Sequence, residues 1–192
     1  MDALILAGGE NKRLQVTKGF LEINSKKIIE SNVEKLKRLF DRVIISTDNP
    51  ELYFYLGVPM VGDVFKDRGP MTGILSVLSI PEVSELFVTA CDMPFIKSEL
   101  IKYIVDKWSG RWDAIVPIFD NKPQPLLGIY SKKIAQNIEQ SIKNGERSLR
   151  RFLHTISVLY IEERDVRAID PEGKSFVNIN TIDDYLLIAH NS

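Results

Sequence analysis

The sequence predicts an α/β fold in which a mostly parallel central sheet carries helices on both faces. Short runs of β-branched and apolar residues alternate along the chain with segments of helical periodicity, a pattern typical of strand–helix–strand units. In addition, Leu4–Leu6 and Phe87–Ala90 are nearly continuous apolar runs. Such runs are expected of central parallel strands, because helices cover both faces of the sheet.

The predicted strands are short segments rich in apolar residues. In chain order they are Ala3–Leu6, Arg42–Ser46, Pro59–Val61, Leu86–Ala90, Ala114–Pro117, Leu126–Tyr130 and Ser157–Ile161. The chain shows no internal repeat, low-complexity tract or Gly/Ser-rich linker, so we expect its 192 residues to form one domain.

Helical periodicity is clearest at Ile28–Leu39, where the apolar side chains of Ile28, Ile29, Val33, Leu36 and Leu39 share one face. The other predicted helices are Thr72–Leu78, Ser98–Trp108, Lys132–Ile142, Ser148–His154 and Asp184–Ala189. Thr181, Asp183 and Asp184 favour a helix N-terminus at the last of these, since acidic residues in the first turn complement the helix dipole.

The composition is that of an ordinary soluble globular protein, with 44% apolar and 27% charged residues. Lys and Arg (25) nearly balance Asp and Glu (26), so the chain has no bulk attraction to nucleic acid or membrane surfaces. The single cysteine, Cys91, cannot form an intramolecular disulfide, which fits a reducing compartment. No apolar run approaches membrane-spanning length, and the first residues are too acidic for a signal peptide, so we expect a cytoplasmic protein.

The loop after the first strand is the most informative segment for function. Leu6-Ala7-Gly8-Gly9 leads to Arg13 and Lys18, without matching the P-loop or the dinucleotide glycine motif. Paired glycines let the backbone turn tightly and present N–H groups to an anion, while Arg and Lys neutralise phosphate charge. Because this loop follows the first strand of an α/β sheet, we expect a triphosphate site. The alternative for the loop is a glycine turn with a solvated basic face. Lys18 is the better candidate for a phosphate ligand, since Arg13 can instead form a salt bridge beside the loop.

Asp92 is the candidate metal ligand. It ends an apolar run, and Pro94 then prevents the strand from continuing. Mg²⁺ takes hard oxygen ligands, usually one or two carboxylates together with water and substrate phosphates. That Asp92 caps the following turn is an equally good interpretation. Cys91 beside it is expected to be a small core residue rather than a nucleophile.

Three further polar segments are candidates for the same site. Asp63 follows a short strand and can accept hydrogen bonds from a base or ribose, or serve as a turn residue. Gly69 and Gly73 flank the start of a helix whose free N–H groups can face a ligand, although a Gly-Pro turn explains them equally. Asn178 and Asn180 point the same way along an extended segment and can contact phosphate, or act as caps.

Taken together, these segments resemble the molybdenum cofactor guanylyltransferases, which belong to a nucleotidyltransferase family with a glycosyltransferase-A-like, Rossmann-type fold. The resemblance spans nearly the whole chain and rests on Leu6–Gly9 with Arg13 and Lys18, on Gly69–Gly73, on Ala90–Phe95 and on Asn178–Thr181. It implies transfer of GMP from GTP to the phosphate of molybdopterin or its metal-loaded form, with Mg²⁺ bound and pyrophosphate released.

The resemblance also implies roles for individual residues. Asp92 would bind Mg²⁺ and the nucleotide, Lys18 and the loop amides would stabilise charge on the leaving pyrophosphate, and Arg13 is a further candidate catalytic residue. Gln124, Asn178 and Asn180 would line the second-substrate side, and residues 145–148 match a recurrent family segment. Nucleotide contacts would come from Leu6, Ala7, Gly8, Gly9, Lys18, Ser46, Asp63 and Asp92.

The first loop departs from the family pattern. The family usually has Arg-Met-Gly before its lysine and an acidic residue directly ahead of it, whereas Arg13–Lys18 is one residue shorter and lacks both the glycine and the acid. Ser46 stands where the guanylyltransferases often carry an amide. Because a few hydrogen bonds here choose the base, the alternatives are a cytidylyltransferase for the same cofactor, or a guanylyltransferase for cobinamide or a sugar phosphate.

A non-catalytic nucleotide- or cofactor-binding relative is an alternative of another class. Lys18 and Asp92 argue against it, because binding without turnover needs no metal carboxylate. The partners implied by the resemblance are the small molecules GTP and molybdopterin, together with transient contacts to molybdoenzymes or other cofactor-synthesis proteins.

Overall fold

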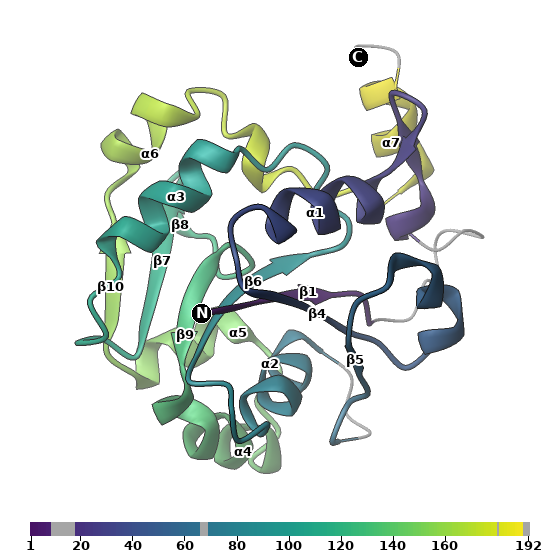
Figure 1. The fold of residues 1–192 in the computed structure, drawn as a ribbon. Helices are drawn as coiled ribbons and strands as arrows, with labels where there is room; N and C mark the ends of the chain where they lie inside the picture. The colour runs from purple at the N-terminus through teal and green to yellow at the C-terminus, as the bar shows by residue number, and fades with distance from the viewer. Residues whose placement is uncertain (9–17, 66–68, 180, 190–192) are drawn as a thin grey trace.

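A mixed sheet forms the centre of the molecule, with strand order β10-β7-β9-β6-β1-β4-β5 and β8 paired to β7 (Figure 1). This computed structural model describes residues 1–8, 18–65, 69–179 and 181–189. Parallel pairs join β1 to β4 and β6, β4 to β5, and β7 to β10, whereas β9 runs antiparallel to β6 and β7. The sheet is therefore mostly parallel, as predicted. Its strands are β1 (Asp2–Leu6), β4 (Arg42–Ser46), β5 (Met60–Val61), β6 (Glu85–Ala90), β7 (Ala114–Phe119), β8 (Lys122–Pro123), β9 (Gly128–Ser131) and β10 (Val158–Ile161).

Helices cover both faces of this sheet (Figure 1). One face carries α1 (Ile28–Lys37), α3 (Ser98–Lys107) and α6 (Glu163–Ile169). The opposite face carries α2 (Pro70–Leu78), α4 (Ala135–Lys143) and α5 (Leu149–Phe152). Short 3₁₀ helices are η1 (Lys18–Phe20), η2 (Pro50–Leu52), η3 (Phe54–Leu56), η4 (Lys132–Ile134), η5 (Leu153–Thr155) and η6 (Lys174–Phe176).

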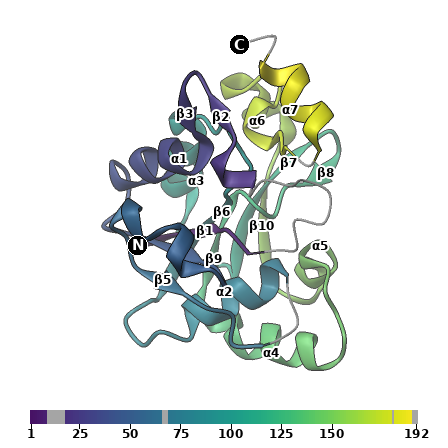
Figure 2. The same ribbon diagram turned by 90° about the vertical axis from the view of Figure 1, so that its right-hand side faces the viewer.

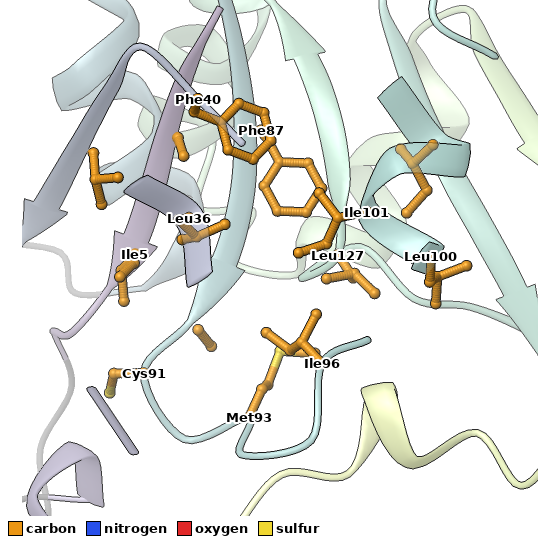
Figure 3. Close-up of a cluster of buried hydrophobic side chains, with 14 of the residues drawn as sticks. Ile5, Leu36, Phe40, Phe87, Cys91, Met93, Ile96, Leu100, Ile101 and Leu127 are labelled. Carbon is orange, nitrogen blue, oxygen red and sulfur yellow. The ribbon is translucent and has the colours of Figure 1, made fainter. Parts of the chain in front are cut away.

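Alternating side chains of β1 fill two separate cores. Ala3 and Ile5 join the core under α1 and α3, whereas Leu4 and Leu6 join the core under α2 and α4. Figure 3 shows part of the first core, in which the rings of Phe40 and Phe87 stack with their centroids 5.0 Å apart. Because both faces of β1 are buried, its sequence must be apolar at successive positions.

Several short elements are not predicted from the sequence. β2 (Glu22–Ile23) and β3 (Lys26–Lys27) form a two-stranded hairpin, and β8 forms a second hairpin with the end of β7. Two-residue strands are too short to show alternation, but their turns carry the positive φ angles of type I′ hairpins, at 51° and 62° for Asn24 and Ser25. The charged helix α6 was also missed, because Val166 is its one buried residue and no apolar stripe marks it.

The C-terminal helix α7 (Ile182–Ala189) lies beside the β2–β3 hairpin (Figures 1 and 2). The hydroxyl of Tyr185 donates to the carbonyl oxygen of Glu22 at 2.8 Å. Thr181 Oγ1 accepts from the N–H of Asp184 at 3.1 Å, and the Asp184 carboxylate accepts from the N–H of Thr181 at 2.9 Å. This reciprocal capping confirms the predicted helix start. Within the described residues, no helix is both long enough and apolar enough to span a membrane.

Candidate active site

Three parallel strands end together at one edge of the sheet. Leu6, the last residue of β1, stands opposite Ser46 at the end of β4 and Ala90 at the end of β6. The ladder continues past the strands, because the N–H of Ala7 donates to Ser46 O at 2.9 Å and that of Cys91 to Leu6 O at 3.0 Å. Figure 2 views the molecule from the side on which β1 ends. The carboxyl edge of a parallel sheet is the usual place for a ligand in such folds.

The first turn of α2 packs directly on this edge. A Cβ atom added to Gly73 would lie 2.6 Å from Leu6 Cδ2 and 2.7 Å from Ser46 Oγ, so only glycine allows this approach. Gly69 precedes the helix without a side-chain cap. The N-terminal N–H groups of α2 therefore lie at the strand ends, where they can contribute to binding an anion.

Asp63 lies beside the first loop. The hydroxyl of Ser46 donates to Asp63 Oδ1 at 3.2 Å, which fixes the carboxylate at the end of β4. The other carboxylate oxygen, Oδ2, lies 4.0 Å from the position that a Cβ atom of Gly8 would occupy. The structure thus brings together Gly8, Ser46 and Asp63, three of the residues that the resemblance assigns to the nucleotide.

Asp92 follows β6 at the same edge, and its side chain is 8% exposed. Two backbone oxygens of its loop are held by distant segments: Asp92 O accepts from the N–H of Ile179 at 3.0 Å, and Met93 O accepts from Asn32 Nδ2 at 3.1 Å. Lys35, one turn further along α1, donates to the carbonyl oxygen of Ile96. The loop carrying Asp92 is therefore anchored by α1 on one side and by residue 179 on the other.

The donor set around Asp92 fits a hard cation that the substrate helps to hold. No group of three His, Cys, Asp or Glu side chains comes together within the part of the chain that the structure describes. A cation at Asp92 would therefore complete its coordination with nucleotide phosphates and water, which is how Mg²⁺ is usually bound in nucleotide sites.

The 3₁₀ helix η1, which begins at Lys18, packs against the end of β6. A Cβ atom added to Gly19 would lie 3.3 Å from Ile29 Cβ and 3.4 Å from Cys91 Cβ. The backbone that follows the first loop is thereby brought next to the residue preceding Asp92. Cys91 itself is buried in the core under α1, as predicted for a packing residue (Figure 3).

A buried ion pair joins the loop after β6 to the C-terminal segment. Asp170 is fully buried; its Oδ1 atom lies 3.2 Å from Lys97 Nζ in an ion pair, and its Oδ2 atom accepts from the N–H of Ser175 at 2.8 Å. The Ser175 hydroxyl in turn accepts from the N–H of Lys97 at 3.0 Å. Burial raises the pKa of Asp170, but the hydrogen bonds from Ser175 and Lys97 outweigh it and hold that pKa below its ordinary value.

This segment forms one wall of a cavity of about 330 Å³ next to Asp92. Gln124 and Asn178, both assigned by the resemblance to the second substrate, lie in the same cavity. The amide nitrogen of Gln124 donates within the β7–β8 hairpin, to Phe119 O at 3.2 Å, and its amide oxygen can act as an acceptor for a ligand. The described residues that line the cavity are Met93, Gln124, Pro125, Leu126, Leu127, Arg150, Phe176 and Asn178.

Some of the predicted site residues lie outside this description. Gly9, Arg13 and Asn180 fall outside the described residues, as does the side chain of Lys18. Arg150 and the Lys97–Asp170 pair were missed by sequence reasoning. Arg150 is one of two adjacent arginines in a short helix, and nothing in the sequence tells which of them lies at a cavity. Lys97 and Asp170 are 73 positions apart by their numbers, 170 less 97, so no local pattern indicates that they meet.

Comparison with known proteins gives a consistent family. Residues 3–161 match the family described as MobA-like NTP transferase domain. The molybdenum cofactor guanylyltransferase of Syntrophotalea carbinolica is 32% identical over 95% of this chain and 88% of its own length. A protein of Methanosarcina acetivorans named "Probable molybdenum cofactor guanylyltransferase" is 36% identical over 95% of this chain and 87% of its own.

Solved structures agree with this comparison. The crystal structure of molybdopterin-guanine dinucleotide biosynthesis protein A from Archaeoglobus fulgidus superposes with a TM-score of 0.83 at 29% identity, covering 100% of this chain and 98% of that one. The bifunctional IspDF of Campylobacter jejuni has a TM-score of 0.71 at 13% identity, with 95% of this chain and 52% of that chain covered. The second similarity concerns the fold alone.

Proposed function

This chain belongs to the family of MobA-like NTP transferase domains, and from that premise we propose that it transfers GMP from GTP to the phosphate of molybdopterin. The observation that carries the proposal is the adjacency of two sites at the end of β6. Asp92 follows β6 at the edge of the sheet where β1 and β4 also end, while the next residue, Met93, lines the cavity together with Gln124 and Asn178. GTP bound at the sheet edge and molybdopterin bound in the cavity would therefore meet at the loop that carries Asp92 and Met93.

In the proposed reaction, an oxygen of the acceptor phosphate attacks the α-phosphorus of GTP. The new P–O bond forms as the bond between the α-phosphorus and the bridging oxygen breaks, and pyrophosphate leaves with that electron pair. No covalent nucleophile from the protein is required, since positioning and charge neutralisation account for most catalysis of this kind. The buried Cys91 therefore has no catalytic role.

The chain's own groups would position and neutralise the donor. Gly8, the N-terminal N–H groups of α2 and the Ser46–Asp63 pair line the nucleotide edge. We assign Leu6, Ala7 and Gly9 to the same contacts, and Lys18 and Arg13 to the charge of the leaving pyrophosphate. Asp92 would hold the divalent metal, which we propose to be Mg²⁺; when bound, this ion neutralises charge on the triphosphate.

The acceptor would occupy the cavity beside Met93. Its apolar wall includes Leu126 and Phe176, which are partly exposed and against which a flat ring can pack, while Gln124 and Asn178 offer amide groups to the ring edge. We also assign Asn180 to this side. As a soluble enzyme for small molecules, the protein would act as a single domain in the cytoplasm, with transient protein contacts that deliver or receive the cofactor.

Product formation with separate nucleotides tests this function. Purified protein is incubated anaerobically with molybdopterin, Mg²⁺ and either GTP, CTP or ATP, and both pyrophosphate and the dinucleotide product are quantified. We expect GTP to give equal amounts of pyrophosphate and molybdopterin-guanine dinucleotide, and CTP and ATP to give little. Product from CTP but not GTP would replace the guanylyl assignment by a cytidylyl one, and nucleotide binding without product would indicate a binding protein.

A further inference from the structure

Among the described residues that line the cavity beside Met93, Arg150 is the one that carries a charge. The other described lining residues are apolar or carry a neutral amide, and none of them is a carboxylate. A cation in such surroundings attracts an anionic ligand, because none of these described neighbours neutralises it.

The helix that carries Arg150 is firmly seated. Leu149 and Phe152 of α5 are 4% and 0% exposed, so the helix is fixed on the sheet by its apolar face. Ser148 caps it, with its hydroxyl oxygen accepting from the N–H of Arg151 at 3.2 Å. A guanidinium held on an anchored helix loses less conformational entropy when it binds a ligand.

The guanidinium of Arg150 makes a hydrogen bond at the side of the cavity formed by residues 124–127. Its Nη2 donates to the carbonyl oxygen of Pro123 at 3.2 Å, at the start of the loop that supplies Gln124 and Pro125 to the cavity. Its other N–H groups make no hydrogen bond to a described residue. An Arg side chain has five donors in a fixed fork, so this arrangement retains capacity for a bidentate contact with oxygen atoms.

The neighbouring Arg151 behaves differently, which makes it a natural reference. Its guanidinium makes two hydrogen bonds of 2.8 Å to the carboxylate of Glu146 and lowers the pKa of that carboxyl to about 2. The charge of Arg151 is therefore satisfied within the loop before α5, and Arg151 is absent from the cavity lining.

We infer that Arg150 binds the phosphate of the acceptor in this cavity, an inference that rests on the proposed function. Both reactants carry negative charge, so an acceptor phosphate that approaches a bound triphosphate is repelled unless a cation on its own side compensates. Arg150 supplies that cation from the acceptor side, and its planar fork matches the geometry of phosphate oxygens. It thereby selects for a phosphate monoester over a neutral pterin.

The test compares Arg150→Gln and Arg150→Lys with Arg151→Gln in anaerobic steady-state assays. For Arg150→Gln we expect the KM for molybdopterin to rise about tenfold or more, as for loss of a charge-assisted contact, while the KM for GTP stays within about twofold. Arg150→Lys keeps the charge but not the planar fork of donors, so its KM for molybdopterin should lie between those of the parent protein and Arg150→Gln. Arg151→Gln should resemble the parent protein, and inorganic phosphate should compete with molybdopterin less well in Arg150→Gln than in the parent.

Two outcomes would overturn the inference, and they are distinguishable from failure of the proposed function. If the parent protein forms the dinucleotide and Arg150→Gln has an unchanged KM for molybdopterin, Arg150 does not bind the acceptor although the function stands. If Arg150→Gln and Arg151→Gln raise that KM equally, the effect is one of general charge and the specific contact is absent. If the parent forms no dinucleotide, the proposed function fails and the inference fails with it.

Discussion

The backbone N–H of Ile179 donates to the carbonyl oxygen of Asp92 at 3.0 Å, so the residue after Asn178 is bonded directly to the candidate metal ligand. This hydrogen bond connects the segment that lines the cavity, at Asn178, with the loop that carries Asp92 at the nucleotide edge. It also makes the site sensitive to whatever holds residues 170–179 in place. The predictions below begin with that segment.

Asp170→Ala should destabilise the protein by about 2 kcal/mol, because it removes a fully buried acceptor and leaves the N–H of Ser175 without its partner. Lys97, whose side chain is 36% exposed, can turn to solvent and limits the loss. The free energy of unfolding from urea titration measures this effect. Asp106→Asn, an exposed change on α3, serves as the control. A loss no larger than that of the control would contradict the role given to Asp170.

The same carboxylate predicts a change of stability in acid. The pKa of Asp170 is lower in the folded protein than in the unfolded chain, where it is about 3.9. Its contribution is therefore present above the unfolded pKa and is lost as the pH falls through the folded pKa. The urea midpoint of the parent should fall more steeply below about pH 4 than that of Asp170→Asn. Parallel curves for the two proteins would refute this.

Gly173→Ala should be considerably more harmful than Gly57→Ala. Both glycines have left-handed backbones, with φ of 65° and 59°, and an L-residue there costs about 1–2 kcal/mol. At Gly57 an added Cβ meets nothing within 4 Å, whereas at Gly173 it would lie 2.2 Å from the ring of Phe119. The difference between their unfolding free energies isolates that clash.

The clash at Gly173 should also reach the acceptor cavity. Phe119 packs on Phe176, with ring centroids 5.2 Å apart, and Phe176 lines the cavity. We therefore expect Gly173→Ala to raise the KM for molybdopterin more than the KM for GTP. Gly57 is the C-cap residue of η3, distant in sequence from Gly173, so Gly57→Ala should change neither the KM for molybdopterin nor the KM for GTP. Equal changes in both constants for Gly173→Ala would argue against this route.

Gly73→Ala should act on the opposite side and weaken GTP binding. Its Cβ atom would displace Ser46 Oγ, 2.7 Å away, and with it the hydrogen bond from Ser46 to Asp63. Ser46→Ala removes the same bond without the steric conflict and is the matched comparison. Titration with GTP and Mg²⁺ should show a weaker affinity for both variants, with Gly73→Ala the weaker, because it also shifts the start of α2. An unchanged affinity for GTP in both variants would contradict the assignment of Asp63 to the nucleotide site.

The extent to which sequence predicts this molecule follows from the range of its contacts. The apolar runs of β1 and β6 and the stripe of α1 depend on local periodicity, and all three elements were predicted. The convergence of residues 6, 46 and 90 follows in turn, because parallel strands end at the same edge. Gly73 could be identified only as a helix-start glycine, since its reason, the approach to Leu6 and Ser46, is tertiary.

The acceptor side was harder to predict for a physical reason. Its lining comes from the loop after β6, the segment after β8, α5 and residues 176–178, and the N–H of Lys97 meets the Ser175 hydroxyl across 78 positions of sequence. Neither short-range periodicity nor composition carries information on such contacts. Gln124 and Asn178 were assigned to the second substrate by family resemblance, and that assignment stays a prediction; the presence of Arg150 in the same cavity needed the structure.

The most direct test of the account is the rate of GMP transfer to molybdopterin by Asp92→Asn. This variant keeps the size of the side chain and removes the charge that would hold the metal, so we expect turnover to fall on the order of 10²-fold or more. Asp106→Asn, an equal change of charge on the exposed face of α3, should transfer GMP at the parental rate. Parental turnover in Asp92→Asn at saturating GTP and Mg²⁺ would contradict the account at its centre.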